Sequence, residues 1–287
     1  MFASISALSC MDATIKYLSA HNHVLAVAGA RYVLGSVFAC AIWVHAGRPT
    51  ITREMLGAHF IRAFFIAASA CSFFWAIRHL PLVEIITLTF VSPLVVPLAA
   101  WVIVGERPRP TSLAAASLGF AGVIVAVQGA PPGEQSELRL LAIGAAMFSA
   151  ITFAISVAMM RARARTDHAA SVGFLASALP CVLILPFALV FATPPRMVDW
   201  PFFLLVGVLA AAAMYLMARA YSAAEAQQLA PIHYTELIWA GLIGYFIFQE
   251  AVRPEVLMGA VVIIGASLFA AWDERRLSAR AKARDAA

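Results

Sequence analysis

Apolar runs long enough to cross a lipid bilayer recur from one end of the sequence to the other. A spanning helix needs about 20 mostly apolar residues. The runs from Leu94 to Val104 and from Val256 to Trp272 are apolar on every face, unlike the alternating strands of a β-barrel. We therefore predict an all-α integral membrane protein with ten transmembrane helices, at residues 2–19, 25–45, 60–79, 83–104, 112–129, 138–160, 170–192, 201–221, 228–249 and 256–272.

The composition agrees with a lipid environment. Hydrophobic residues make up 63% of the chain and charged residues 12%, whereas a soluble domain is roughly half apolar and about a quarter charged. The net charge of +5 is spread over the loops and not gathered on one face, so we expect no nucleic-acid partner.

The basic residues predict the orientation. If the N-terminus is cytoplasmic, the outer loops hold only Arg78, Arg139, Arg196 and Arg253, and most of the other Lys and Arg residues lie on the inner side. An excess of Lys and Arg marks the cytoplasmic face. We expect a multi-pass protein of the cytoplasmic (inner) membrane with both termini in the cytoplasm.

An internal repeat refines this topology. The segment Val104–Pro110, which closes the fourth span, has a counterpart in Phe248–Pro254, which closes the ninth. Five spans per copy is an odd number, so the second copy would be inverted, as in many secondary transporters. We predict a first repeat at 1–130, an external linker at 131–137, a second repeat at 138–272 and a basic cytoplasmic tail at 273–287.

A series of residues along the chain resembles a known family. It comprises Met11-Asp12, Lys16, Arg31, His59, Arg62, Phe73-Phe74, Leu80-Pro81-Leu82, Glu84, Pro93 and Gly105-Glu106-Arg107. This pattern resembles the drug/metabolite transporter superfamily in its EamA-type branch. The resemblance implies ten helices in two inverted five-helix repeats around a central cavity. Similar proteins export amino acids, including aromatic ones, or take up S-adenosylmethionine or riboflavin. The second copy departs from the pattern at Gln249, opposite Gly105, and at Leu237, opposite Pro93.

Ionisable residues inside the spans are candidates for substrate binding or coupling, because each is costly in a bilayer. Asp12 and Lys16 lie one helical turn apart and are expected to pair, either as a structural ion pair or as part of a binding site. Arg31 is a candidate anchor for a substrate carboxylate.

Glu236 is the leading single candidate. Eight residues into the ninth span, it would lie near the membrane midplane and bind a substrate amino group or a proton. The alternative is a protonated side chain that is hydrogen-bonded to a neighbouring helix. His233 and Trp239 share its face, and Tyr234 lies nearby.

Aromatic and polar residues near the span ends form a second set of candidates. Trp75, His79 and Glu84 lie toward the outer ends of the third and fourth spans, and Trp101 lies near the inner end of the fourth. They would line the cavity or its mouth, or belong to the interfacial aromatic belt.

Small residues and prolines suggest packing contacts and hinges. Gly119, Gly122, Gly259 and Gly265 are expected to allow close helix contacts. Four prolines inside the spans are either hinges for alternating access or kinks that only shape the bundle: Pro93, Pro97, Pro180 and Pro186.

These features favour a secondary transporter that exports amino acids, including aromatic ones, by alternating access. Uptake of S-adenosylmethionine or a riboflavin-like compound is the alternative, and a non-transporting receptor or structural protein is a remote one. No nucleophile–base pair, metal motif or Walker sequence is present, so we expect neither an enzyme nor a bound cofactor. The expected partners are a small-molecule substrate, the lipid bilayer and a coupling proton, for a monomer or homodimer.

Overall fold

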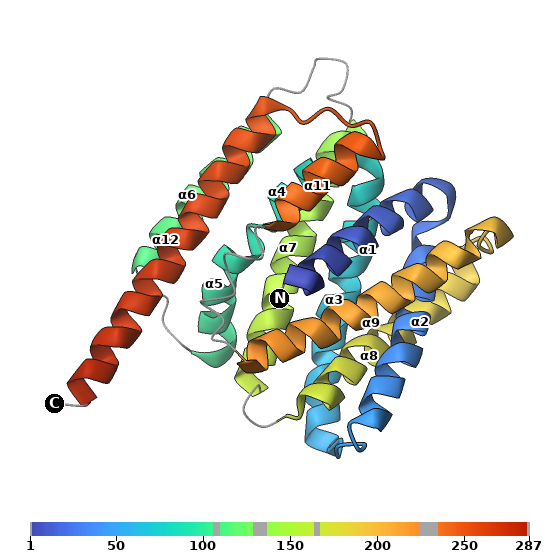
Figure 1. The fold of residues 1–287 in the computed structure, drawn as a ribbon, viewed down its shortest axis with the longest axis horizontal. Coiled ribbons are helices and arrows are strands. Elements are labelled where there is room, and N and C mark those ends of the chain that lie inside the picture. The colour runs from blue at the N-terminus through green and yellow to red at the C-terminus, as the bar shows by residue number, and fades with distance from the viewer. Residues whose placement is uncertain (1, 106–109, 129–136, 164–166, 224–234, 286–287) are drawn as a thin grey trace.

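The computed structural model (Figure 1) describes residues 2–105, 110–128, 137–163, 167–223 and 235–285. All regular elements within these residues are helices. In chain order they are α1 (Phe2–His21), α2 (Val24–His45), α3 (Arg53–His79), α4 (Leu82–Thr89), α5 (Ser92–Val104), α6 (Pro110–Val127), α7 (Glu137–Arg163), α8 (Ala169–Phe191), the 3-10 turn η1 (Met197–Asp199), α9 (Trp200–Ala223), α11 (Thr235–Phe246) and α12 (Pro254–Asp285).

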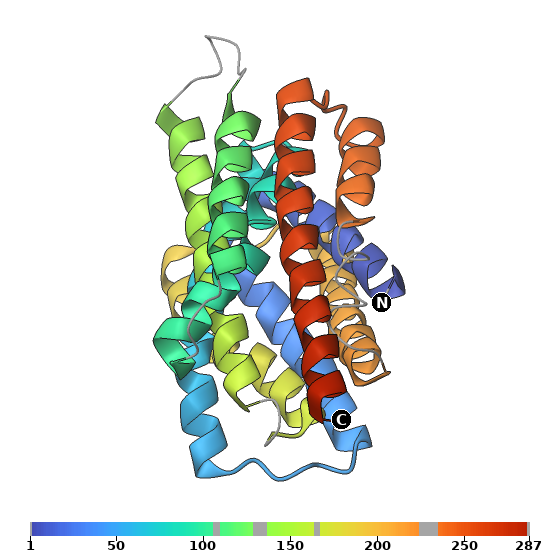
Figure 2. The same cartoon turned by 90° about the vertical axis from the view of Figure 1, so that its left-hand side faces the viewer.

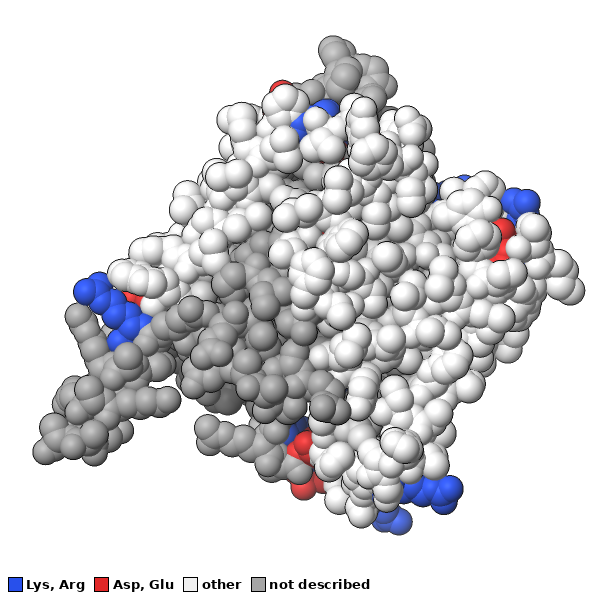
Figure 3. All heavy atoms as spheres, viewed as in Figure 1, with Lys and Arg blue, Asp and Glu red and all other residues white. Residues whose placement is uncertain are grey.

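Six stretches of the described residues are long and apolar enough to cross a membrane. They are Val24–His45, Arg53–His79, Leu82–Ile103, Glu137–Met160, Ala169–Phe191 and Pro254–Asp273. Shorter apolar helices cover Leu113–Ala126 and Met197–Ala213. On the face shown in Figure 3, the charged side chains of the described residues gather at the ends and edges, and a broad uncharged surface lies between them. This pattern fits a protein surrounded by lipid.

The predicted fourth span is not one continuous helix. It divides into α4 and α5, with a turn at Phe90 and Val91. Pro93 stands in the first turn of α5, where its missing N–H costs no helical hydrogen bond. The two pieces together still form one apolar stretch, Leu82–Ile103, which agrees with the predicted span at 83–104, and the break lies close to Pro93, one of the predicted kink or hinge positions.

The other boundaries differ in smaller ways. α3 begins at Arg53, where the Thr52 hydroxyl accepts a hydrogen bond from the Met55 amide, and α12 continues as a helix into the predicted tail. The first residues of the predicted ninth span, with His233 and Tyr234, lie outside the described residues. Pro97 lies inside α5, and Pro180 and Pro186 lie inside α8, which all remain helical. Their role as hinges stays a prediction.

The helices pack in a regular set of pairs. α6 and α12 lie side by side (Figures 1 and 2), α3 packs on α7, α1 on α9, and α2 on α8. Gly122 and Gly259 allow the close approach of α6 and α12, and Gly119 packs against Leu94. A Cβ at Gly265 would meet open space, so no close contact forms there within the described part of this chain.

α4 lies in the core of the bundle. Every residue from Leu82 to Leu88 is buried, including the ionisable Glu84, which is fully inaccessible. A charged group at such a position needs partners within the protein. α4 therefore places Glu84 where it needs charged partners from other parts of the chain.

Candidate functional site

Buried and partly buried charged side chains from several helices and from the α11–α12 connection form two groups near α1. We call the first the α4 cluster (Lys16, Glu84, Arg139, Glu250 and Arg253) and the second the Asp12 group (Asp12, Arg31 and Glu236). Burying a charge is costly unless it is paired. The geometry of each group therefore indicates what it can bind.

Lys16 joins α1 to the start of α4. Its Nζ lies 2.6 Å from Glu250 Oε1 and donates a hydrogen bond of 2.5 Å to the Leu80 carbonyl. The expected pairing of Lys16 with Asp12 is therefore wrong. Glu250 and the Leu80 carbonyl together offer Lys16 a charged and a neutral acceptor, and Asp12 interacts with Arg31.

Glu250 also caps α4. Its Oε2 accepts a hydrogen bond of 2.7 Å from the Leu82 amide, and Pro81, at the cap position, makes no side-chain cap bond. A carboxylate is stabilising at a helix N-terminus because the free amides and the helix dipole favour negative charge. One side chain from the α11–α12 connection thus holds both α1 and α4.

Glu84 is held by two arginines. Arg139 Nη2 lies 2.5 Å from Glu84 Oε1, and Arg253 Nη2 contacts Oε2. The sequence suggested Glu84 as a residue of the cavity or its mouth, but its two oxygens are both engaged in this conformation. Glu84 would reach a substrate only after these contacts open.

The Asp12 group is less fully paired. Asp12 is 7% exposed and interacts electrostatically with both Arg31 and Glu236. Arg31 lies over the Tyr32 ring at 4.3 Å and near the Phe74 ring at 5.8 Å. Its Nε is buried and has no hydrogen-bond partner among the residues that the structure describes. Two carboxyl groups suit a cationic group, and an arginine flanked by aromatic rings suits a carboxylate.

The remaining predicted residues are dispersed. Trp239 packs near Phe2, with ring centroids 6.2 Å apart, and so lies where α11 meets α1. The rings of Trp75 and His79 contact each other in a tilted arrangement, with centroids 4.5 Å apart. Trp101 is 50% exposed, which fits a position at the protein's outer surface better than one in a binding site.

Several charged residues of the interior were not predicted as site residues. In the sequence, Arg139 and Arg253 were used only to predict the membrane orientation, and Glu250 only as part of the repeated segment. Their partner Glu84 is 55 and 169 positions away in the sequence from the two arginines. The recurring Glu-containing segment was the one available signal, since it placed Glu250 at the end of a span.

Comparisons with known proteins agree with this architecture. The model of the EamA-like transporter family matches residues 1–128 and again residues 139–272. The chain belongs to the EamA-like transporter family. It is therefore a multi-pass membrane protein of a transporter family, and the resemblance drawn from its sequence is confirmed.

Individual relatives of this EamA-like protein carry different substrates. It is 23% identical to an S-adenosylmethionine uptake transporter of Rickettsia bellii, over 95% of this chain and 92% of the relative. It is 28% identical to a riboflavin transporter of Brucella anthropi, over 94% and 96%. It is 24% identical to a pseudopaline exporter of Pseudomonas aeruginosa, over 91% and 90%.

A solved crystal structure shows the same fold. It aligns with a TM-score of 0.67 at 19% identity and covers 96% of this chain and 97% of its own. At this identity the likeness concerns the fold alone.

Proposed function

We propose that this EamA-like protein is a secondary transporter for small amphipathic metabolites that carry an α-amino acid group. The observation that carries the proposal is the Asp12 group. In it Asp12 interacts electrostatically with Arg31 and with Glu236, and the Arg31 Nε has no hydrogen-bond partner among the described residues. An α-amino acid group presents the complementary charges, an ammonium and a carboxylate.

Export of amino acids, including aromatic ones, is the favoured activity, because Tyr32 and Phe74 flank Arg31 and offer rings to an aromatic side chain. Uptake of S-adenosylmethionine is the second candidate. The named activity of the Rickettsia relatives supports it, and that compound combines an amino acid group with a sulfonium cation. A riboflavin-like compound fits less well, since it has neither an ammonium nor a carboxylate.

An inverted repeat would supply the two alternating states. If α1, α2, α3, α4–α5 and α6 correspond to α7, α8, α9, α11 and α12, then the packing of α3 on α7 corresponds to that of α9 on α1. In the same way, the packing of α2 on α9 corresponds to the packing of α8 on α3. Gly105 and Gln249, which occupy equivalent positions of the sequence repeat, both have positive φ, at 80° and 56°. These correspondences support repeats at 1–130 and 138–272, with a linker at 131–137.

The α4 cluster would close one side of the transport path. Lys16 and Glu84 come from the proposed first repeat, and Arg139, Glu250 and Arg253 come from the second. In the predicted orientation, with both termini in the cytoplasm, this cluster lies on the outer side. Opening to that side requires these ion pairs to separate, at a cost that substrate binding or a proton gradient would offset.

Flux into proteoliposomes of the purified protein tests the proposal. The compounds are labelled Phe, Tyr, Trp, Thr, S-adenosylmethionine and riboflavin, each with and without a pH gradient. Saturable amino-acid flux supports the favoured activity, and a gradient effect supports proton coupling. Flux of S-adenosylmethionine alone supports the second candidate. Flux of riboflavin alone, or of none of these compounds, would contradict the proposed substrate class.

A further inference from the structure

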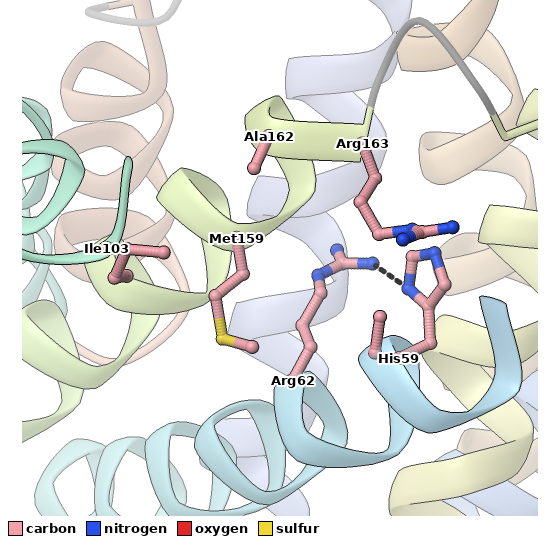
Figure 4. A pocket seen from close by; sticks show the side chains of 7 residues that line it. His59, Arg62, Ile103, Met159, Ala162 and Arg163 are labelled. Atoms are coloured by element: carbon pink, nitrogen blue, oxygen red, sulfur yellow. Dashed lines mark hydrogen bonds between the residues drawn. The ribbon is translucent and has the colours of Figure 1, made fainter. Parts of the chain in front are cut away.

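A cavity of about 170 Å³ lies between α3, α5 and α7 (Figure 4). No residue of the Asp12 group or of the α4 cluster lines it. Arg62 from α3 and Arg163 from α7 extend toward His59 at one side of the cavity, and Met159 and Ile103 lie at the other. Basic side chains therefore stand at one side of a cavity whose accessible lining is mostly apolar.

Arg62 is a buried cation with neutral partners. It is 8% exposed. Its Nε donates to the Ser156 carbonyl at 3.2 Å, Nη1 lies 3.3 Å from His59 Nδ1, and Nη2 lies 3.5 Å from the Met160 sulfur. No carboxylate forms an ion pair with Arg62 in the part of the chain that the structure describes. A buried guanidinium without a counter-ion is unfavourable, so this position favours a bound anion.

The neighbouring carboxylates are committed to other partners. Asp167 Oδ2 lies 3.0 Å from His59 Nε2 and 2.9 Å from Arg163 Nε. Glu54 lies 2.8 Å from Arg163 Nη1. The hydrogen bonds to Asp167 and Glu54 raise the pKa of Arg163, which keeps it cationic at the rim of the cavity. His59 is held between Asp167 and Arg62, and its ring orients the guanidinium.

The apolar side suits a hydrocarbon chain. Ile103 is 41% exposed and, with Met159 and Ala162, completes the cavity lining on that side. Arg163 follows the apolar stretch that ends at Met160, so the basic side lies near the level at which α7 leaves the hydrocarbon region. Lipid headgroups occupy that level, and basic pockets between membrane helices bind anionic ones.

We propose that this cavity is a binding site for a phosphate group, with Arg62 as its principal ligand and Arg163 at its rim. The guanidinium of Arg62 has five N–H donors in a planar fork, and this fork matches phosphate oxygens. The phosphate belongs either to an anionic phospholipid, which the apolar wall favours, or to a soluble phosphate. Binding at this site is measured without flux. The test therefore does not depend on which metabolite the protein carries.

Lipid titration with native mass spectrometry tests the site on the purified full-length protein in a neutral detergent. The probes are dioleoylphosphatidylglycerol and, as the neutral-lipid comparison, dioleoylphosphatidylcholine. Inorganic phosphate is titrated separately by calorimetry. We expect tighter binding of phosphatidylglycerol than of phosphatidylcholine, and a loss of about ten- to a hundredfold in its affinity in Arg62→Gln, as removal of a charged hydrogen-bonding partner implies.

Two further variants separate the site from general effects. Arg196→Gln is the matched control, because the Arg196 side chain is 54% exposed and its ion-pair distance to Asp199 is 3.9 Å; it should bind like wild type. Met159→Trp fills the cavity and keeps both arginines, so it tests the site even if Arg62→Gln does not fold. Binding of inorganic phosphate that is lost in the same variants would support the site with a soluble source. Unchanged phosphatidylglycerol binding in both variants, or no wild-type binding of either phosphate source, would overturn the proposal.

Discussion

At the scale of single residues, the interior of this protein contains charged groups that are fully paired and charged groups that are only partly hydrogen-bonded. Glu84 has both oxygens engaged by arginines, whereas the buried Nε of Arg31 has no hydrogen-bond partner within the described part of the chain. A fully paired charged group stabilises one conformation, whereas a group with a free hydrogen-bonding position favours binding of a ligand. The two kinds of residue should therefore respond differently to substitution.

Glu84→Gln should mainly reduce stability. The amide leaves Arg139 and Arg253 without their shared carboxylate, and breaking a buried pair costs about 3 to 5 kcal/mol. Denaturation by SDS in mixed micelles measures the change. Glu54→Gln is the control, because that side chain is 82% exposed and a surface pair contributes only about 0 to 1 kcal/mol. Equal losses in both variants would contradict the role of burial.

Glu236→Gln should instead abolish or uncouple transport and leave folded protein in the membrane. The amide cannot become anionic, so it can neither pair with a substrate ammonium nor exchange a proton. Flux, with the melting profile of the same preparation, measures both effects. Glu255→Gln, which alters a carboxyl in the first turn of α12, is the control. Wild-type flux from Glu236→Gln would remove Glu236 from the site.

At the scale of helices, α6 and α12 approach each other closely at their glycines. A Cβ on Gly259 would lie 2.5 Å from both the Ala126 Cβ and the Gly122 carbonyl oxygen, and 2.8 Å from the Ala126 amide nitrogen. The backbone atoms cannot move away as a side chain would. Gly259→Val should therefore lower stability by about 1 to 3 kcal/mol. Gly265→Ala, on the same helix but facing open space, should cause no loss. SDS denaturation of the two variants compares them directly.

The sequence predicted most of the helices but not how their charged residues meet. Apolar length alone places α2, α7 and α8 within a few residues of the predicted spans, because lipid requires long runs with internally paired backbone groups. Apolar length does not change at Phe90 and Val91, so the break there was indicated only by the nearby Pro93 and Pro97, which the sequence marked as kinks or hinges. The pairing of Lys16 with Glu250 depends on packing between elements that are far apart in the sequence.

At the scale of the whole molecule, the α4 cluster connects the two proposed repeats on one side. If transport alternates between two states, these ion pairs must separate in every cycle. A covalent link in their place should then hold the protein in one state. The pair Lys16 and Glu250, with 2.6 Å between Nζ and Oε1, is suited to such a link because its two residues come from different repeats.

We predict that cross-linking Lys16→Cys with Glu250→Cys stops flux reversibly. The four native cysteines are first replaced, since Cys10 is exposed and Cys40, Cys71 and Cys181 are only partly buried. A short bis-methanethiosulfonate reagent then spans the two positions, because direct disulfide formation requires Cα atoms within about 7 Å. Each single-cysteine variant receives the same reagent as a control, which separates the link from simple modification. Flux should fall to background only in the double variant and return on reduction to its level before treatment. Full flux from quantitatively cross-linked protein would mean that the α4 cluster does not open during transport, and the path would then have to pass on another side of α4.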